Sequence, residues 1–164
     1  MTDRLTPEQR SHVMSRIRSR NTRPEMVVRR FLWSEGYRYR LCVGKLPGRP
    51  DIVMRKLKVA IFINGCFWHG HDAHKRHTPK SNVDYWSKKI ENNKRRDIEN
   101  GIRLRSMGWT VITIWECELA PKLRAATLAA LGETLRLLAS TPYRRTDSDA
   151  LNIAAEPEFS YSPS

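Results

Sequence analysis

The chain has 164 residues, with 30 Lys and Arg residues against 17 Asp and Glu residues, so its net charge is +13. This length fits a single domain with a self-supporting core. The positive charge favours a polyanionic partner, and nucleic acid is the leading candidate. No long apolar segment or signal-peptide pattern opens the chain, so we expect a soluble, cytoplasmic protein with no membrane partner. The three cysteines, Cys42, Cys66 and Cys117, are too few and too odd in number for a disulfide framework. They are expected to be free thiols or metal ligands.

The first third of the chain contains two helix N-terminal signals. Residues 6–9 combine an N-cap threonine, a proline and a glutamine, but the helix that follows has few apolar residues among its arginines. It is therefore predicted to be an arm. The same start signal recurs at Thr22, Pro24 and Glu25, and apolar residues then recur at helical spacing until Gly36. This second segment is predicted to be an amphipathic helix.

Three strands and a long loop should follow. Residues 37–41 alternate with period two, residues 51–54 follow a Pro/Gly turn, and residues 59–63 form a buried apolar run. The short basic connection at 55–58 predicts antiparallel pairing of the last two strands. Residues 64–79 have no periodicity and are predicted to be a loop with a function.

The rest of the chain predicts a helix, a strand and a helix. From about Asn82 to Gly108 apolar side chains recur at helical spacing, at Trp86, Ile90, Ile98 and Ile102, and a clear strand follows at 109–115. The last helix has its leucines on one side, and residues after 140 are rich in Ser, Thr, Pro and charge. The long helix crosses over between two neighbouring strands, so the fold class is α/β with a mixed central sheet covered by helices on both faces. The leucines of the last helix are Leu128, Leu131, Leu135 and Leu138.

The long loop and the last strand end supply a candidate zinc site. Cys66, His71 and His74 lie close together in sequence, and Cys117 follows the last strand. Thiolate and imidazole groups suit zinc, which takes four such ligands in structural sites. The alternative is two buried cysteines and a set of solvated histidines.

Asp51 and His69 stand at two strand ends that should lie close together. A carboxylate beside an imidazole suits magnesium and a base that activates water. Asp51 is equally well explained as the capping aspartate of a turn, and Glu25 fits a helix capping box as well as a catalytic role.

Three large aromatic residues, Phe67, Trp68 and Trp86, stand beside polar loops. Such residues usually pack in the hydrophobic core. On a strongly basic protein, stacking on bases or intercalation between them is the alternative.

Taken together, these motifs resemble the very-short-patch mismatch repair endonuclease (Vsr) family. The resemblance runs from about Met14 to Cys117 and is densest in three stretches: Leu46 to Asp51, Gly65 to His71, and Trp115 to Cys117. Further matches are Met14 to Ile17, Thr22 with Glu25, Pro79 to Asn82, Trp86, Asp97, and Gly108 with Trp109.

The resemblance implies a restriction-endonuclease-like core and a structural zinc site. It also implies a Mg²⁺-dependent hydrolase that nicks one strand of duplex DNA beside the thymine of a T·G mismatch, left when 5-methylcytosine deaminates. Asp51 then binds the magnesium with the backbone carbonyl of Ile63, and His69 is the base. Glu25 and Asp97 support this site. Met14 and the aromatic residues Phe67, Trp68 and Trp86 contact the DNA.

The implied organisation is a DNA-contacting arm at residues 1–20, an endonuclease domain at 21–139 and a disordered tail at 140–164. The protein is expected to act as a monomer on mismatched double-stranded DNA, with contacts to other repair proteins allowed. Two other functions stay open: a zinc-stabilised DNA-binding module without cleavage, and a general nuclease of the same fold.

Two positions depart from the family pattern. Asn64 stands where a histidine near the metal-bound waters is usual, which predicts a differently tuned outer shell. Ala73 stands where some members carry the third zinc ligand, so His74 is assigned, with Asp72 and His77 as alternatives.

Overall fold

The structure is a computed structural model that describes residues 20–71 and 82–140. Its helices are α2 (Arg23–Ser34), α3 (Val83–Ser106) and α4 (Arg124–Ser140), and its strands are β1 (Arg40–Leu41), β2 (Ile52–Met54), β3 (Val59–Asn64) and β4 (Thr110–Trp115). Two short 3₁₀ helices, η1 (Arg55–Leu57) and η3 (Glu116–Leu119), follow β2 and β4. The predicted arm helix with Met14, the zinc-ligand candidates Asp72, His74 and His77, and the predicted tail beyond Ser140 lie outside the described residues.

Helix α2 begins and ends as the sequence predicts. The Thr22 hydroxyl accepts a hydrogen bond from the Glu25 N–H, and Pro24 occupies the first turn, where no backbone donor is needed. The helix ends before Gly36, whose φ of +82° is in the left-handed region that favours glycine. Val28 and Leu32 are buried on its inner face. The prediction of an amphipathic helix is confirmed.

The four strands form one mixed sheet in the order β1-β2-β3-β4. β1 and β2 are antiparallel, as are β2 and β3, whereas β3 and β4 are parallel and joined by the α3 crossover. The strand predicted at 37–41 is reduced to Arg40 and Leu41. β2, its partner, ends at Met54, where the chain turns into η1, so residues 37 and 38 have no strand opposite them.

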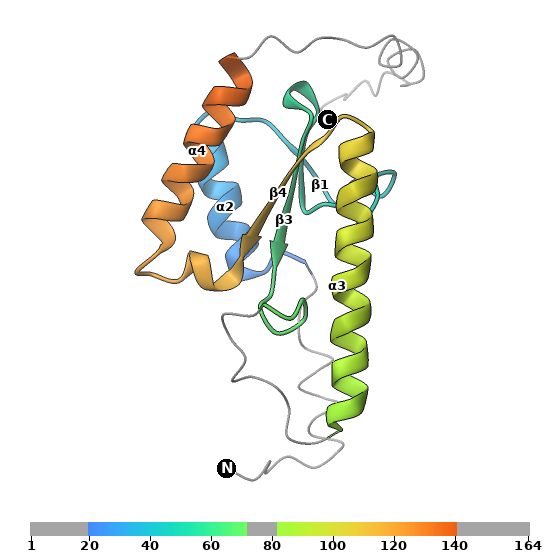
Figure 1. Cartoon of the computed structure of the whole chain (residues 1–164). Helices are drawn as coiled ribbons and strands as arrows, with labels where there is room; N and C mark the ends of the chain where they lie inside the picture. Colours follow the sequence, from blue (N-terminus) through green and yellow to red (C-terminus); the bar gives the residue numbers. More distant parts are fainter. Residues whose placement is uncertain (1–19, 72–81, 141–164) are drawn as a thin grey trace, which may run out of the picture.

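Helices cover both faces of the sheet. Figure 1 shows α2 and α4 on one side and α3 on the other. Successive strand residues point to opposite faces, so Ile52, Met54, Val59 and Ile61 pack in the core with α2 and α4. Val53 and Ala60 pack on the other side with Leu104 of α3 and Trp109. The predicted α/β architecture is confirmed at this level.

The inner face of α3 differs from the one predicted. Ile98 and Ile102 were expected to continue the face of Trp86 and Ile90, but they are 63% and 59% exposed, whereas Gly101 and Leu104 are buried. An α-helix turns by about 100° per residue, so a spacing of four residues drifts by about 40° at every step. Over the 16 residues from Trp86 to Ile102 this drift carries the side chain to the opposite side.

Among the described residues, no helix is both long enough and apolar enough to cross a membrane.

Candidate active site and metal centre

The first group of site residues gathers where β3 ends. Asp51 lies next to Ile52, which pairs with Ile61 of β3, so the register places Asp51 beside the end of that strand. Its Oδ2 accepts a hydrogen bond of 2.8 Å from the Ile63 N–H. One carboxylate oxygen is therefore anchored to the sheet, and the side chain has a fixed orientation.

The environment of Asp51 disfavours its charged form. Burial raises the pKa of Asp51 above its usual 3.8, and the negative charge of Glu25 acts in the same direction. The hydrogen bond from Ile63 and the charge of His69 oppose this shift and lower the pKa. A carboxylate held in this way gains from a nearby cation. The charges of Glu25 and His69 therefore both act on Asp51.

His69 comes from the loop after β3 and is held by α3. Its Nδ1 lies 2.5 Å from Asp97 Oδ2, and the two side chains are 29% and 39% exposed. A carboxylate oxygen can only accept, so Nδ1 donates the proton of this hydrogen bond. The imidazole then keeps Nε2 as its acceptor, which is the tautomer that a general base requires.

Glu25 is a buried capping residue. Its carboxylate accepts hydrogen bonds from the Asn21 N–H at 3.0 Å and from the Thr22 hydroxyl at 2.8 Å. The capping interpretation is therefore confirmed. Its charge nevertheless acts on Asp51, so the cap also contributes to the electrostatics of the site.

A second group of side chains joins the same loop to the segment after β4. His71 Nδ1 lies 3.6 Å from Cys66 Sγ and 3.4 Å from Cys117 Sγ, and the three ligand atoms lie within 4.8 Å of one another. Tetrahedral zinc with ordinary bond lengths places a sulfur and a nitrogen ligand about 3.6 Å apart. These three residues therefore fit such an ion, and the structure contains a possible Cys/His metal site.

Two neighbours shape this metal centre. The His71 ring stacks on Trp115 of β4, with centroids 4.1 Å apart and an interplanar angle of 4°. Burial and the adjacent Cys66 and Glu118 raise the pKa of the Cys117 thiol to about 11. Without a cation this sulfur therefore stays protonated at neutral pH, and a bound metal ion would favour the thiolate instead.

The three aromatic residues singled out in the sequence form one cluster beside these groups. Phe67 lies 5.0 Å from Trp68 and 5.3 Å from Trp86, between ring centroids, and the two tryptophans are 5.8 Å apart. Tyr85 extends the cluster with an edge contact to Trp86 at 5.4 Å. Phe67, Trp68 and Trp86 are all half-buried. They belong to neither hydrophobic core cluster of the described chain.

Helix α3 contributes site residues that the sequence analysis missed. Asn93 Nδ2 donates to the Trp68 carbonyl at 2.8 Å, and the Lys89 ammonium lies 5.4 to 5.7 Å from three aromatic ring centroids. The spacing of residues in the sequence could have identified Asn93. Trp86, Ile90, Asn93 and Asp97 recur every three or four residues and so lie on one side of a helix. Trp115 was also missed as a support for His71.

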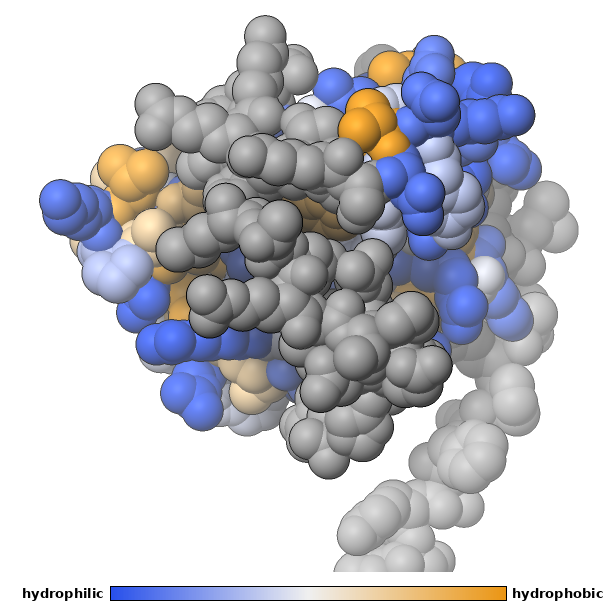
Figure 2. Space-filling model, turned by 90° about the horizontal axis from the view of Figure 1, so that it is seen from below, coloured by the Kyte–Doolittle hydropathy of each residue, from blue (hydrophilic) through white to orange (hydrophobic). Residues whose placement is uncertain are grey.

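The structure thus brings most of the predicted site residues to one end of the sheet. Asp51, His69, Asp97 and Glu25 form one group, Cys66, His71 and Cys117 form another, and the aromatic cluster lies beside them. Seen from that end, the side of the molecule over α3 is mostly hydrophilic (Figure 2). Met14 and His74 lie outside the described residues, and the metal-binding role of the Ile63 carbonyl stays a prediction.

This arrangement defines a class of protein: a basic α/β protein with a carboxylate and an oriented imidazole beside half-buried aromatic rings. Comparison with known proteins agrees with this class. The family model described as DNA mismatch endonuclease Vsr matches residues 2–75.

Three relatives extend the match over most of the chain. The type II nicking enzyme V.NmeAIP of Neisseria meningitidis serogroup A is 50% identical over 122 residues, which cover 74% of this chain and 87% of the relative. The type II nicking enzyme V.XorIIP of Xanthomonas oryzae pv. oryzae is 51% identical over 120 residues, 73% of this chain and 88% of the relative. The DNA mismatch endonuclease Vsr of Escherichia coli K12 is 37% identical over 110 residues, 67% of this chain and 70% of the relative. The chain therefore belongs to the Vsr family of DNA endonucleases.

Proposed function

We propose that this protein is a Mg²⁺-dependent endonuclease that nicks one strand of duplex DNA beside the thymine of a T·G mismatch and so initiates very-short-patch repair. The observation that carries the proposal is the placement of Asp51 and the His69–Asp97 pair at one end of the sheet, next to an aromatic cluster, in a chain of net charge +13. Hydrolysis and recognition of distorted DNA would then take place side by side.

The chemical step assigns one role to each polar side chain. His69 Nε2 accepts a proton from water, whose oxygen attacks the phosphorus of the scissile phosphodiester in line with the leaving 3′ oxygen. The new P–O bond forms as the bond to the 3′ oxygen breaks, and the leaving oxygen takes a proton from a solvent water, which leaves a 5′-phosphate and a 3′-hydroxyl. Asp97 holds the imidazole in orientation and stabilises it once it is protonated.

Oxygen ligands for magnesium are few in this site. Asp51 offers the oxygen that Ile63 does not hold, and the Ile63 carbonyl is the second proposed ligand, whereas both Glu25 oxygens are engaged in the helix cap. Magnesium prefers six oxygen ligands and keeps several waters, so the DNA phosphate and water would complete the set. Bound Mg²⁺ supplies charge neutralisation at the phosphoryl oxygens.

Mismatch recognition is assigned to Phe67, Trp68 and Trp86. The half-buried rings could stack on bases exposed at an opened step, and a mismatched step opens at lower cost than a sound one. Met14 in the N-terminal arm, residues 1–20, is proposed to contact the opposite groove. Residues 21–139 would form a restriction-endonuclease-like core, and residues 140–164 a tail.

Zinc is proposed as the ion held by Cys66, His71 and Cys117, with His74 as the fourth ligand and Asp72 or His77 as alternatives. The protein is proposed to act as a monomer in the cytoplasm, open to contact with other repair proteins. Asn64, the buried last residue of β3, would leave the outer shell of the magnesium differently tuned from that of members with histidine there.

The test is a nicking assay with purified protein, on matched duplexes and on a panel of T·G duplexes with different flanking bases. We expect nicking of T·G duplex only, dependent on Mg²⁺, and no nicking by Asp51→Ala or His69→Ala, both of which should still bind the mismatch. Binding without nicking by the parent protein would support a non-cleaving module, and equal nicking of matched duplex would support a general nuclease.

A further inference from the structure

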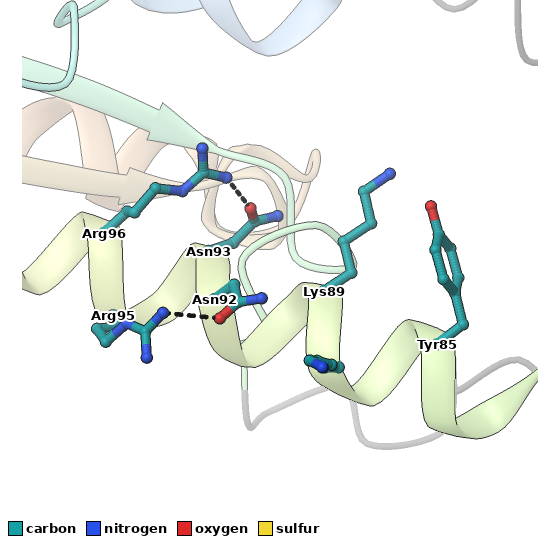
Figure 3. A pocket seen from close by; sticks show the side chains of 7 residues that line it. Tyr85, Lys89, Asn92, Asn93, Arg95 and Arg96 are labelled. Atoms are coloured by element: carbon teal, nitrogen blue, oxygen red, sulfur yellow. Dashed lines mark hydrogen bonds between the residues drawn. The ribbon is translucent and has the colours of Figure 1, made fainter.

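Helix α3 carries an open groove that the proposed chemistry does not use. The groove has a volume of about 540 Å³ and is lined only by α3 side chains. Its lining combines four cations, two amides and a phenol, with no carboxylate; the residues are Tyr85, Lys88, Lys89, Asn92, Asn93, Arg95 and Arg96. Figure 3 shows Tyr85 and Lys89 extending from the same side of the helix, with the hydroxyl and the amine at their outer ends.

The groove runs along the helix as a continuous stripe. Tyr85, Lys89, Asn92 and Arg96 are spaced by four, three and four residues, so they lie on one side of α3, with Lys88 and Arg95 beside them. At 1.5 Å per residue the stripe is about 16 Å long. One strand of duplex DNA carries a phosphate for every 3.4 Å of helix axis, so the groove matches the length of several phosphates.

Two of the cations are oriented by neutral partners. Arg95 Nη2 donates to Asn92 Oδ1 at 2.9 Å, and Arg96 Nη2 donates to Asn93 Oδ1 (Figure 3). An amide oxygen fixes a guanidinium group without cancelling its charge, and the other N–H groups stay able to bind a phosphate. Within the described chain, the one ion pair that these cations form joins Arg95 to Glu99 at 4.0 Å, between two side chains more than 60% exposed. A pair of that kind stabilises little.

The groove also lies directly beside the proposed site. Asn93, which accepts from Arg96, donates to the Trp68 carbonyl, and Lys89 lies over the rings of Trp68 and Trp86. A polyanion in the groove would therefore run alongside the aromatic cluster.

We propose that this groove binds the phosphate backbone of duplex DNA whether or not the duplex contains a mismatch. The inference rests on the DNA substrate of the proposed function and adds a docking site to it. Backbone contacts carry no sequence information. The groove therefore holds the duplex in register, while the aromatic cluster distinguishes mismatched base-pair steps from matched ones. It contributes equally to binding of matched and mismatched duplex.

The experiment is a salt titration of DNA binding with full-length protein. Lys88→Gln combined with Arg95→Gln removes two groove charges, and Lys56→Gln combined with Lys122→Gln removes two exposed charges elsewhere. Dissociation constants are measured for matched and T·G duplexes of one length over a range of KCl concentrations. If each groove cation neutralises one phosphate, the slope of log K against log[KCl] should become shallower by about 1.8 for the groove variant and stay unchanged for the control.

The preference for T·G over matched duplex should be the same in both variants and in the parent. Equal slopes in the groove and control variants would overturn the proposal, as would a loss confined to mismatched duplex. An acidic protein segment as the true occupant would also leave the slope unchanged. Binding is measured without cleavage, so the two proposals can fail separately. If the slope changes as expected but the parent protein never nicks DNA, the groove proposal stands and the proposed function is refuted.

Discussion

Two histidines only two residues apart belong to chemically different centres. His69 turns to α3 and meets a carboxylate, Asp97, whereas His71 turns to the end of β4 and meets two sulfur atoms, of Cys66 and Cys117. Oxygen partners orient an imidazole for proton transfer, and sulfur partners suit a soft or borderline metal ion. The comparison teaches that the chemistry of each histidine in this loop is set by the element that packs against it.

The two centres also share a property. In each, burial raises the pKa of an acidic group, Asp51 in one and Cys117 in the other. Both groups are therefore poised to gain from a positive charge. They differ in what the charge would do, because the thiol centre would tie the loop after β3 to the end of β4, whereas the carboxylate centre would act on a substrate.

Cys117→Ser should have the largest effect, because structural metal binding contributes directly to folding free energy. We expect loss of one metal ion per chain and a fall in Tm of about 10 °C or more. Elemental analysis and thermal melting measure both. Cys42→Ser is the matched control, since Cys42 lies outside the Cys/His cluster. Full metal content and unchanged Tm in Cys117→Ser would mean that the thiol centre binds no structural ion.

Asp97→Asn should act on the other centre alone. Without the carboxylate the imidazole loses its orientation, so the nicking rate should fall by about 10²- to 10⁴-fold while metal content and Tm hold. Single-turnover nicking measures the rate. Glu99→Gln, which removes an exposed carboxylate from the same helix, should be close to the parent. A normal rate in Asp97→Asn would remove the residue from the mechanism.

Trp68→Ala tests whether the aromatic cluster belongs to substrate binding or to the core. As a wedge, Trp68 contributes about 1–3 kcal/mol of stacking to T·G duplex and little to matched duplex. Its loss should therefore weaken mismatch binding about 5- to 150-fold with little change in Tm. Loss of a core aromatic would cost about 3–5 kcal/mol of stability instead. A binding titration beside a thermal melt separates the two, with Trp33→Ala as the control for an exposed tryptophan.

Asp51→Asn should raise stability by a small amount. Because the folded-state pKa of Asp51 lies above 3.8, the ionised carboxylate destabilises the fold at any pH above that raised pKa. The cost disappears as pH falls through the raised pKa toward 3.8. In magnesium-free buffer the variant should therefore melt higher than the parent at neutral pH, by about 2–4 °C for each kcal/mol, and the gap should close in acid. Asp84→Asn, on an exposed residue of α3, should show no such trend; a lower Tm for Asp51→Asn at neutral pH would contradict the assigned electrostatics.

Local signals in the sequence determined the order of elements and several of their ends. The cap at Thr22 and the glycine at Gly36 are short-range patterns, and the structure confirms them. The alternation at residues 37–41 predicted a longer strand than the structure has, because only Arg40 and Leu41 pair. The apolar positions of α4 were also predicted from spacing, and Leu131 and Leu135 are buried. The long helix was the exception, because small angular errors accumulate over many turns and placed Ile98 and Ile102 on the wrong side.

Contacts between distant segments were decided only by the tertiary structure. The sequence indicated that Asp51 and His69 would meet at adjoining strand ends, and that cysteine and histidine would share a metal. It did not show that Asp97 holds His69, that Asn93 holds the Trp68 carbonyl, or that Trp115 supports His71. Each of these contacts joins the loop after β3 to α3 or β4, 25 residues or more along the chain. Their geometry depends on how helix and strand pack on the sheet, and that packing is a property of the whole core rather than of any local pattern.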